Sequence, residues 1–143
     1  MARVCLEECF AFAQRRVTFG KTLAEHDVIK VMLAQMACRV EQQQAWLESV
    51  VFQMQQMSKA EASELGATIC GLKAQSGEVL EECARLTTHV FGGNALDAAS
   101  VGRRIQHMAD SQKGYVIPAG ATRIMEMQMT KLAIKQAERV AKL

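Results

Sequence analysis

Three short segments of the chain combine residue types that could bind an anionic or flat ligand. The first is 15-RRVTFGKTLAEHD-27, which places Arg16 a few residues ahead of Phe19 and a glycine. A planar guanidinium matches the geometry of phosphate oxygens. A cation is also favourable at the end of any helix, so ordinary helix capping is the simpler alternative.

The other two segments pair glycine with an expected helix end. In 89-HVFGGN-94, adjacent glycines would let a ligand approach the backbone closely, or would merely stop a helix. In 115-YVIPAGATRIM-125, which holds the chain's one proline, residues 120–122 are expected to begin a helix. Free N–H groups at such a helix start can bind an anion or a polarised carbonyl, although a simple helix start explains them equally.

Histidine and cysteine do not form a pattern typical of metal sites. His26, His89 and His107 are far apart in the sequence, and none lies three or four residues from another. The cysteines are odd in number and form no Cys-x-x-Cys pair: Cys5, Cys9, Cys38, Cys70 and Cys83. We therefore expect no metal, and small buried thiols in a reducing compartment.

Composition excludes several classes of protein. Half of the 143 residues are apolar, which is typical of one folded domain rather than a disordered tail. The net charge of +2 and an aromatic content of 5% argue against a nucleic-acid partner. No apolar run approaches the length of a membrane span, and the first residues carry glutamates where a secretory signal would be apolar.

Heptad spacing predicts two long helices that would position these segments. A helix over 2–17 comes first, Gly20 can end it, and Thr22 with Glu25 has the spacing of a capping box. Apolar residues then recur at spacings of four and three, with one polar interruption: Ile29, Leu33, Met36, Val40, Gln43, Leu47, Val50, Met54 and Met57. A second capping box, Ser58 with Glu61, precedes the next such series: Leu65, Ile69, Leu72, Ser76, Val79, Cys83, Leu86 and Val90.

The two series predict an antiparallel helical hairpin, which the paired glycines end. A loop over 94–100, a shorter helix over about 100–112 and a last helix over about 121–141 should follow. No β pattern of useful length is present. The predicted fold class is all-α: an up-down four-helix bundle plus a short extra helix, as one domain over 1–143.

Taken in order, the three ligand-type segments resemble the C-terminal helical domain of the acyl-CoA dehydrogenases over essentially the whole chain. The matching motifs are Arg16-x-x-Phe19-Gly20-Lys21, His26-Asp27 for a His-Gln pair, His89-Val90-Phe91-Gly92-Gly93, and Tyr115-Val-Ile117-x-x-Gly120-Ala121-Thr122-x-Ile124-Met125. The resemblance implies that the first helix is truncated at Met1 and that an N-terminal helical domain and a middle β-domain are missing.

The resemblance also implies FAD as the cofactor of the full-length parent, with weak or no binding by this fragment. The implied FAD-binding residues are Arg16, Phe19, His89, Val90, Phe91, Gly92, Gly93, Ala121 and Thr122. The implied parent is an oxidoreductase of fatty acid oxidation that performs α,β-dehydrogenation of acyl-CoA thioesters and passes electrons to a partner. It would be a homotetramer (a dimer of dimers), mitochondrial in a eukaryote and otherwise cytoplasmic.

Three departures from the family's motifs bear on this expectation. Asp27 and His89 each stand where the family usually has glutamine, and Ala119 occupies the position of the catalytic glutamate found in many members. Ala119 and Gly120 would then line the acyl pocket, and the chain would hold no catalytic residue. Two alternatives are a stand-alone helical interaction bundle without a cofactor and a non-catalytic degenerate homologue.

Overall fold

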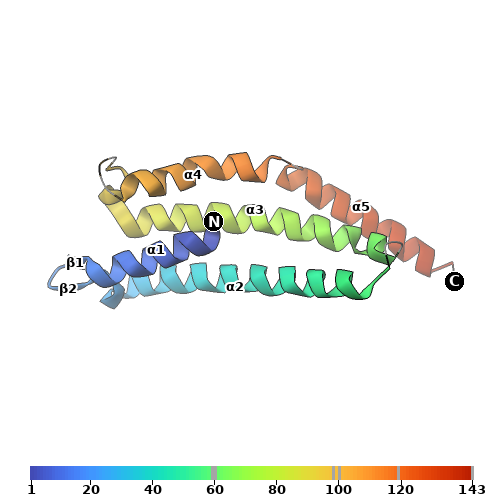
Figure 1. Ribbon diagram of the computed structural model, residues 1–143, viewed down its shortest axis with the longest axis horizontal. Helices are drawn as coiled ribbons and strands as arrows, with labels where there is room; N and C mark the ends of the chain where they lie inside the picture. The colour runs from blue at the N-terminus through green and yellow to red at the C-terminus, as the bar shows by residue number, and fades with distance from the viewer. Residues whose placement is uncertain (59–60, 98, 100, 119, 143) are drawn as a thin grey trace. The chain divides into compact units, whose positions relative to one another are not determined.

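The computed structural model describes residues 1–58, 61–97, 99, 101–118 and 120–142. Its α-helices follow the order expected from the sequence, and short strands and 3₁₀ helices accompany them (Figure 1). They are α1 (Ala2–Arg15), β1 (Val17–Thr18), β2 (Lys21–Thr22), the 3₁₀ helix η1 (Leu23–Glu25), α2 (Asp27–Gln56), the 3₁₀ helix η2 (Glu61–Leu65), α3 (Gly66–Phe91), the 3₁₀ helix η3 (Gly92–Ala95), α4 (Gly102–Val116) and α5 (Thr122–Val140). The all-α prediction is confirmed, and the five α-helices of the described ranges correspond to the predicted four principal helices and one extra helix.

Both predicted capping boxes are confirmed, although each leads into a 3₁₀ helix and the long helices begin later, at Asp27 and Gly66. The Thr22 N–H donates to Glu25 Oε2 at 2.6 Å, and the Ser58 N–H donates to Glu61 Oε2 at 2.9 Å. Each carboxylate therefore satisfies an N–H that the following helix leaves without a partner. Accepting these bonds lowers the pKa of both glutamates, and for Glu25 the hydroxyl of Thr22 is the largest cause.

Several predicted boundaries were wrong. The first helix ends at Arg15 rather than 17, because the chain turns there into a two-stranded hairpin that the sequence did not predict. The loop expected over 94–100 begins later, since η3 extends to Ala95; positions 98 and 100 lie outside the described residues. The helix expected over about 100–112 continues to Val116.

The chain divides into two compact units. Unit 1 comprises residues 1–41 and 79–114, and unit 2 comprises 42–78 and 115–143. The long helices α2 and α3 each contribute one half to each unit. None of the described helices is long and apolar enough to cross a membrane.

Unit 1 contains a continuous apolar core between α1, the first half of α2, the second half of α3, and α4. Its buried members are Cys5, Leu6, Cys9, Ala13, Ile29, Leu33, Met36, Val40, Val79, Cys83, Leu86, Val90, Phe91, Ala95, Ile105 and Met108. Surface ion pairs Arg39–Glu82 at 3.0 Å and Arg104–Glu8 at 2.8 Å connect helices around this core. Such exposed pairs add little stability, so burial of the core supplies most of it.

In unit 2, neighbouring segments pack closely against α3 at positions where α3 carries glycine. A Cβ added at Gly71 would lie 3.1 Å from the Trp46 ring of α2 and 2.8 Å from Met129 Sδ of α5. A Cβ at Gly77 would lie 3.1 Å from Val116 and 3.2 Å from Thr122. The absence of side chains on this face of α3 therefore lets its neighbours approach closely.

The predicted burial of the two heptad series is confirmed in unit 1 and only partly in unit 2. Ile29, Leu33, Met36 and Val40 are buried, whereas Leu47 is 43% exposed and Met54 is 45% exposed. Met57 and Ile69 are exposed as well, and α5 has no buried residue. Heptad spacing shows that these positions share a helix face, but it does not show that this chain covers that face.

Candidate cofactor-binding site

A tight hairpin after α1 presents the first group of predicted site residues. Val17 pairs with Thr22 and Thr18 with Lys21, which leaves Phe19 and Gly20 as the two turn residues. Their φ angles are +52° and +77°, so both are in the left-handed region that two-residue hairpin turns require. Gly20 is left-handed as expected, but it forms the hairpin turn and does not end the helix, because α1 already ends at Arg15. The Phe19 side chain is 97% exposed at the tip.

Arg16 lies at the junction between α1 and this hairpin. Its backbone N–H donates to the Phe12 carbonyl at 2.9 Å, and its carbonyl accepts from the Leu23 N–H at 2.8 Å. The residue is exposed, and no ion pair engages its guanidinium within the described ranges. The backbone of Arg16 is therefore held at both ends while its charge is free to meet a phosphate.

The His26–Asp27 pair closes the hairpin and begins α2. His26 Nε2 lies 3.2 Å from Thr18 Oγ1 and 3.3 Å from the Thr18 carbonyl oxygen. Asp27 accepts a hydrogen bond at 3.0 Å from Lys30, and this bond is the main cause of its lowered pKa. An acid in the first turn of α2 also suits the helix dipole, so Asp27 has a local structural role.

The His89–Gly93 segment forms the end of α3 and the start of η3. His89 is exposed, while Val90 and Phe91 are 3% and 2% exposed and pack in the core of unit 1. Any ligand contact by these two residues would therefore be made through their backbone. A Cβ added at Gly92 (φ +55°) or Gly93 would meet no atom within 4 Å, so the glycine backbone faces open space.

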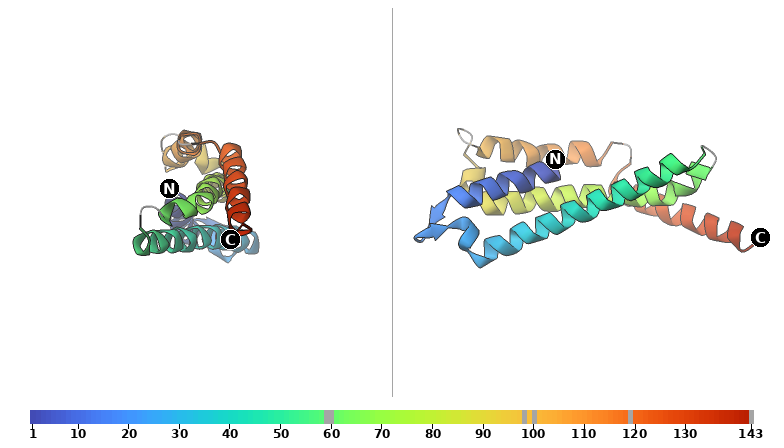
Figure 2. Two further views of the ribbon diagram at one scale, coloured as in Figure 1. Left: turned by 90° about the vertical axis from the view of Figure 1, so that its right-hand side faces the viewer. Right: turned by 60° about the horizontal axis from the view of Figure 1, so that its bottom comes forward.

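The hairpin and the paired glycines belong to the same end of unit 1. Figures 1 and 2 show β1–β2, the end of α3 and the start of α4 gathered there in different views. Stacking of Phe12 in α1 on Phe91 in α3, with ring centroids 4.1 Å apart, joins the helices that carry the two motifs. Unit 1 thus brings together seven of the predicted site residues.

The remaining predicted residues belong to unit 2. Gly120 has a φ of +110°, a conformation that residues with a Cβ rarely adopt, so glycine is favoured there; the nearest atoms belong to the flexible Met125 side chain. The carbonyl of Ala121 accepts from the N–H groups of Ile124 and Met125 at 2.9 and 3.0 Å, while Thr122 is half-buried. These contacts start α5 as predicted. Ala119 lies outside the described residues.

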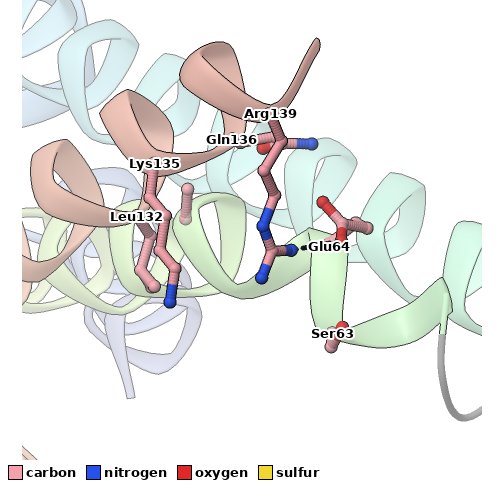
Figure 3. A pocket seen from close by; sticks show the side chains of 7 residues that line it. Ser63, Glu64, Leu132, Lys135, Gln136 and Arg139 are labelled. Atoms are coloured by element: carbon pink, nitrogen blue, oxygen red, sulfur yellow. Dashed lines mark hydrogen bonds and ion pairs between the residues drawn. The ribbon is translucent and has the colours of Figure 1, made fainter. Parts of the chain in front are cut away.

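Unit 2 also contains a surface hollow that the sequence did not reveal. It has a volume of about 200 Å³ and lies between the start of α3 and the second half of α5 (Figure 3). Arg139 in α5 forms an ion pair at 3.3 Å with Glu64 along its wall. The other lining residues are Ser63, Ala67, Leu132, Lys135 and Gln136. No sequence signal marks this hollow, because its residues come from two distant and individually unremarkable helix surfaces.

Metal-ligating residue types do not cluster in the described ranges. No group of three or more His, Cys, Asp or Glu side chains there is arranged to hold a metal ion. The ligand-type chemistry of unit 1 therefore consists of a guanidinium, an aromatic ring and open glycine backbone, and that of unit 2 consists of the start of α5.

Comparison with known proteins identifies the class to which this fold and these motifs belong. A family model described as "Acyl-CoA dehydrogenase, C-terminal domain" matches residues 1–134. The chain therefore belongs to the acyl-CoA dehydrogenase family and corresponds to its C-terminal domain. The family resemblance expected from the motifs is confirmed.

Individual relatives agree with this assignment. The chain is 30% identical over 142 residues to the acyl-CoA dehydrogenase apdG of Emericella nidulans, covering 99% of this chain and 32% of that protein. A solved FAD-dependent dehydrogenase matches with a TM-score of 0.79 at 17% identity, covering 91% of this chain and 33% of the other. A glutaryl-coenzyme A dehydrogenase solved with glutaryl-CoA matches with a TM-score of 0.70 at 22% identity, covering 90% and 31%. These structures share the fold, and the chain spans about a third of the length of its relatives.

Proposed function

We propose that the chain serves as the C-terminal domain of an FAD-dependent acyl-CoA dehydrogenase, in which it contributes surfaces for cofactor binding and oligomerisation. The observation that carries this proposal is the hairpin, with the unpaired charge of Arg16 at its base and the exposed ring of Phe19 at its tip. An exposed cation beside an exposed ring suits a ligand that has both phosphates and flat rings.

The described residues fit such a cofactor in three ways. Arg16 would bind the pyrophosphate, and Phe19 would pack against the cofactor. The open backbone of Gly92 and Gly93, beside His89, would allow close approach because no side chain intervenes. The N–H groups of Ala121 and Thr122 at the start of α5 would face the cofactor.

FAD, when bound in the parent, would accept the hydride removed from the acyl-CoA thioester. At the loop before α5, this chain would contribute a residue that lines the acyl pocket and no catalytic base. Ala119 replaces the glutamate of many members, and its methyl group cannot take up a proton. With Gly120 it would line the acyl pocket, so we expect the fragment alone to be inactive.

Oligomerisation would explain the exposed apolar residues of unit 2. Ile124, Met127 and Ile134 of α5 are 49%, 55% and 54% exposed, and Phe52 of α2 is 64% exposed. A surface this apolar is unusual on a monomer and typical of an interface. The proposed parent is a homotetramer (a dimer of dimers), with a separate protein as its electron acceptor, in mitochondria if the source is eukaryotic and otherwise in the cytoplasm.

Flavin titration of the 143-residue chain tests this proposal. We expect weak quenching of FAD fluorescence and a several-fold further loss of affinity in Arg16→Gln. Arg15→Gln is the matched control, because Arg15 is the neighbouring exposed arginine and its Nε donates to the Ala11 carbonyl. Equal affinity in both variants would contradict the role of Arg16, and a tight complex of the fragment would contradict the need for the parent's other domains.

A non-catalytic homologue is the second candidate, and the residue at position 119 favours it. The two candidates differ in the whole protein. Dehydrogenation of an acyl-CoA by the parent would require a base elsewhere, whereas FAD binding without turnover would indicate a non-catalytic role.

A further inference from the structure

The only described contact of the exposed Phe19 ring with another aromatic ring is with His26. The two ring centroids lie 6.3 Å apart and the planes are inclined by 72°, an edge-to-face arrangement. The rest of the Phe19 side chain meets solvent, since it is 97% exposed. His26 thus lies beside an aromatic ring that little else in unit 1 restrains.

His26 is also bonded to the residue that precedes Phe19. Its Nε2 lies within hydrogen-bond distance of both the hydroxyl and the carbonyl oxygen of Thr18. Thr18 is the last residue of β1, so this contact holds the strand immediately before the turn. One imidazole therefore contacts two successive residues of the hairpin.

The hairpin needs such support because it is very short. Its strands have two residues each, and a turn with a non-glycine residue at φ +52° is costly for phenylalanine. Gly20 gives no packing support, because a Cβ there would meet no atom within 4 Å. An isolated hairpin of this size is not stable in water. Contacts from outside the hairpin must therefore select its conformation.

The base of the hairpin is already fixed by other bonds. The Leu23 N–H donates to the Arg16 carbonyl, and Glu25 closes the capping box on Thr22. These bonds leave Arg16 in place whatever His26 does. At the tip, the described contacts beyond the pairing of Thr18 with Lys21 are those of His26 with Thr18 and with the Phe19 ring.

We propose that His26 is a positioning residue that holds Phe19 in its left-handed, outward conformation through Thr18 and the edge-to-face ring contact. The inference rests on the proposed function only where it makes Phe19 a cofactor contact; the restraint itself is a property of unit 1. His26 acts through Phe19 and is not itself assigned a cofactor contact.

NMR of the isotope-labelled 143-residue chain tests the restraint without any cofactor. The readouts are the backbone coupling and chemical shifts of Phe19 and the nuclear Overhauser contacts between its ring and residue 26. In His26→Leu we expect Phe19 to leave its positive φ and its amide shift to move toward random-coil values. His26→Gln keeps a side-chain amide that can donate to the Thr18 carbonyl, so we expect it to retain most of the native Phe19 signals.

His107→Leu is the control, because it makes the same exchange at an exposed histidine of unit 1, whereas His26 is half-buried. It should leave Phe19 unchanged. Unchanged Phe19 signals in His26→Leu would overturn the inference. Loss of the Phe12 and Phe91 ring shifts in the same variant would also overturn it, because His26 would then support the whole unit. If His26→Gln loses the native Phe19 signals as completely as His26→Leu does, the proposed role of the contact between residue 26 and Thr18 is overturned.

Flavin titration of the same variants separates this inference from the proposed function. If both hold, His26→Leu weakens FAD binding several-fold, and His26→Gln and His107→Leu do so much less. If the NMR result holds and neither the wild-type chain nor its variants bind flavin, the titration is repeated with the full-length parent; a parent that binds no FAD overturns the proposed function while the restraint on Phe19 stands. If flavin binding is unaffected although Phe19 has moved, Phe19 is not a cofactor contact and the functional part of the inference is overturned.

Discussion

The rings of Phe12 and Phe91 stack with their centroids 4.1 Å apart and their planes 17° from parallel. This contact joins α1 to the end of α3. The first helix leads directly into the hairpin of Arg16 and Phe19, and the second leads into the paired glycines. This aromatic contact therefore helps to set the relation between the two motifs of unit 1 that are proposed to contact a cofactor.

The stack should be measurable as an interaction energy. In a double-mutant cycle of Phe12→Leu and Phe91→Leu, we expect a coupling of about 0.5–1.5 kcal/mol in the free energy of urea unfolding. Phe10→Leu provides the control, because Phe10 lies on α1 and is 43% exposed. Combined with Phe91→Leu it should be additive within about 0.5 kcal/mol. Equal coupling in the two cycles would refute a specific ring contact.

Substitution by alanine at two glycines of α4 should change the free energy of unfolding in opposite directions. A Cβ at Gly102 would collide with the carbonyl oxygen of Asn94 and lie 2.7 Å from that of Asp97, and backbone atoms cannot move aside cheaply. We expect Gly102→Ala to lower the free energy of unfolding by about 2–3 kcal/mol. Gly114→Ala meets no atom within 4 Å and should gain up to about 1 kcal/mol from helix propensity. The measurement is the urea midpoint of helical circular dichroism, and loss of the sign difference would contradict the close approach of η3 to α4.

The five thiols should react with a disulfide reagent in distinct phases. Cys38 is exposed and Cys70 is half-buried, whereas Cys5, Cys9 and Cys83 are fully buried in the core of unit 1. At pH 8 we expect one fast thiol, one slower thiol and three that react only in denaturant, because the thiolate must reach the reagent. Cys38→Ser should abolish the fast phase alone. A fast phase that survives this change would show that another thiol is accessible in the native state.

The parts of the fold that depend on neighbouring residues in the chain could be predicted from the sequence. Both capping boxes and the left-handed Gly20 are of this kind, since each needs only a few adjacent residues. The Phe12–Phe91 stack and the tight packing at Gly102 could not be predicted, because distant segments create them. The exposure of Leu47 and Met54 was missed for a related reason. Their spacing shows a shared apolar face, but which molecule covers that face is not encoded in the spacing.

In the candidate site, too, features set by adjacent residues could be predicted, whereas contacts between distant segments could not. Residue types and order identified Arg16, Phe19 and the glycine pair, since motifs are local. Val90 is the last member of the second heptad series, so its burial was expected, whereas burial of the Phe91 side chain could not be read from the motif. The contacts of His26 with Thr18 could not be predicted either, because the hairpin brings together two residues that are eight positions apart in the sequence.

The buried thiols predict a loss of stability at alkaline pH. Burial, which disfavours the thiolate, raises the pKa of Cys9 to about 11 and that of Cys83 to about 12. In the unfolded chain both thiols would titrate near pH 8.5. Above that pH the unfolded state therefore binds fewer protons than the native state, so stability is full below about pH 8.5 and falls as pH rises toward the native values.

Each of these two thiols should contribute a slope of at most about 1.4 kcal/mol per pH unit, approached between the unfolded and native pKa values and smaller near either one. Urea unfolding at half-unit steps from pH 7.5 to 10.5 gives the slope of the wild-type chain. Lysine and tyrosine side chains also titrate toward the upper end of this range, so the comparison is with Cys9→Ala and Cys83→Ala. Each variant starts less stable at pH 7.5 because it loses a buried sulfur, but its stability should fall less steeply than that of the wild type. Parallel curves would mean that the thiols titrate alike in both states, and that their burial does not restrain ionisation.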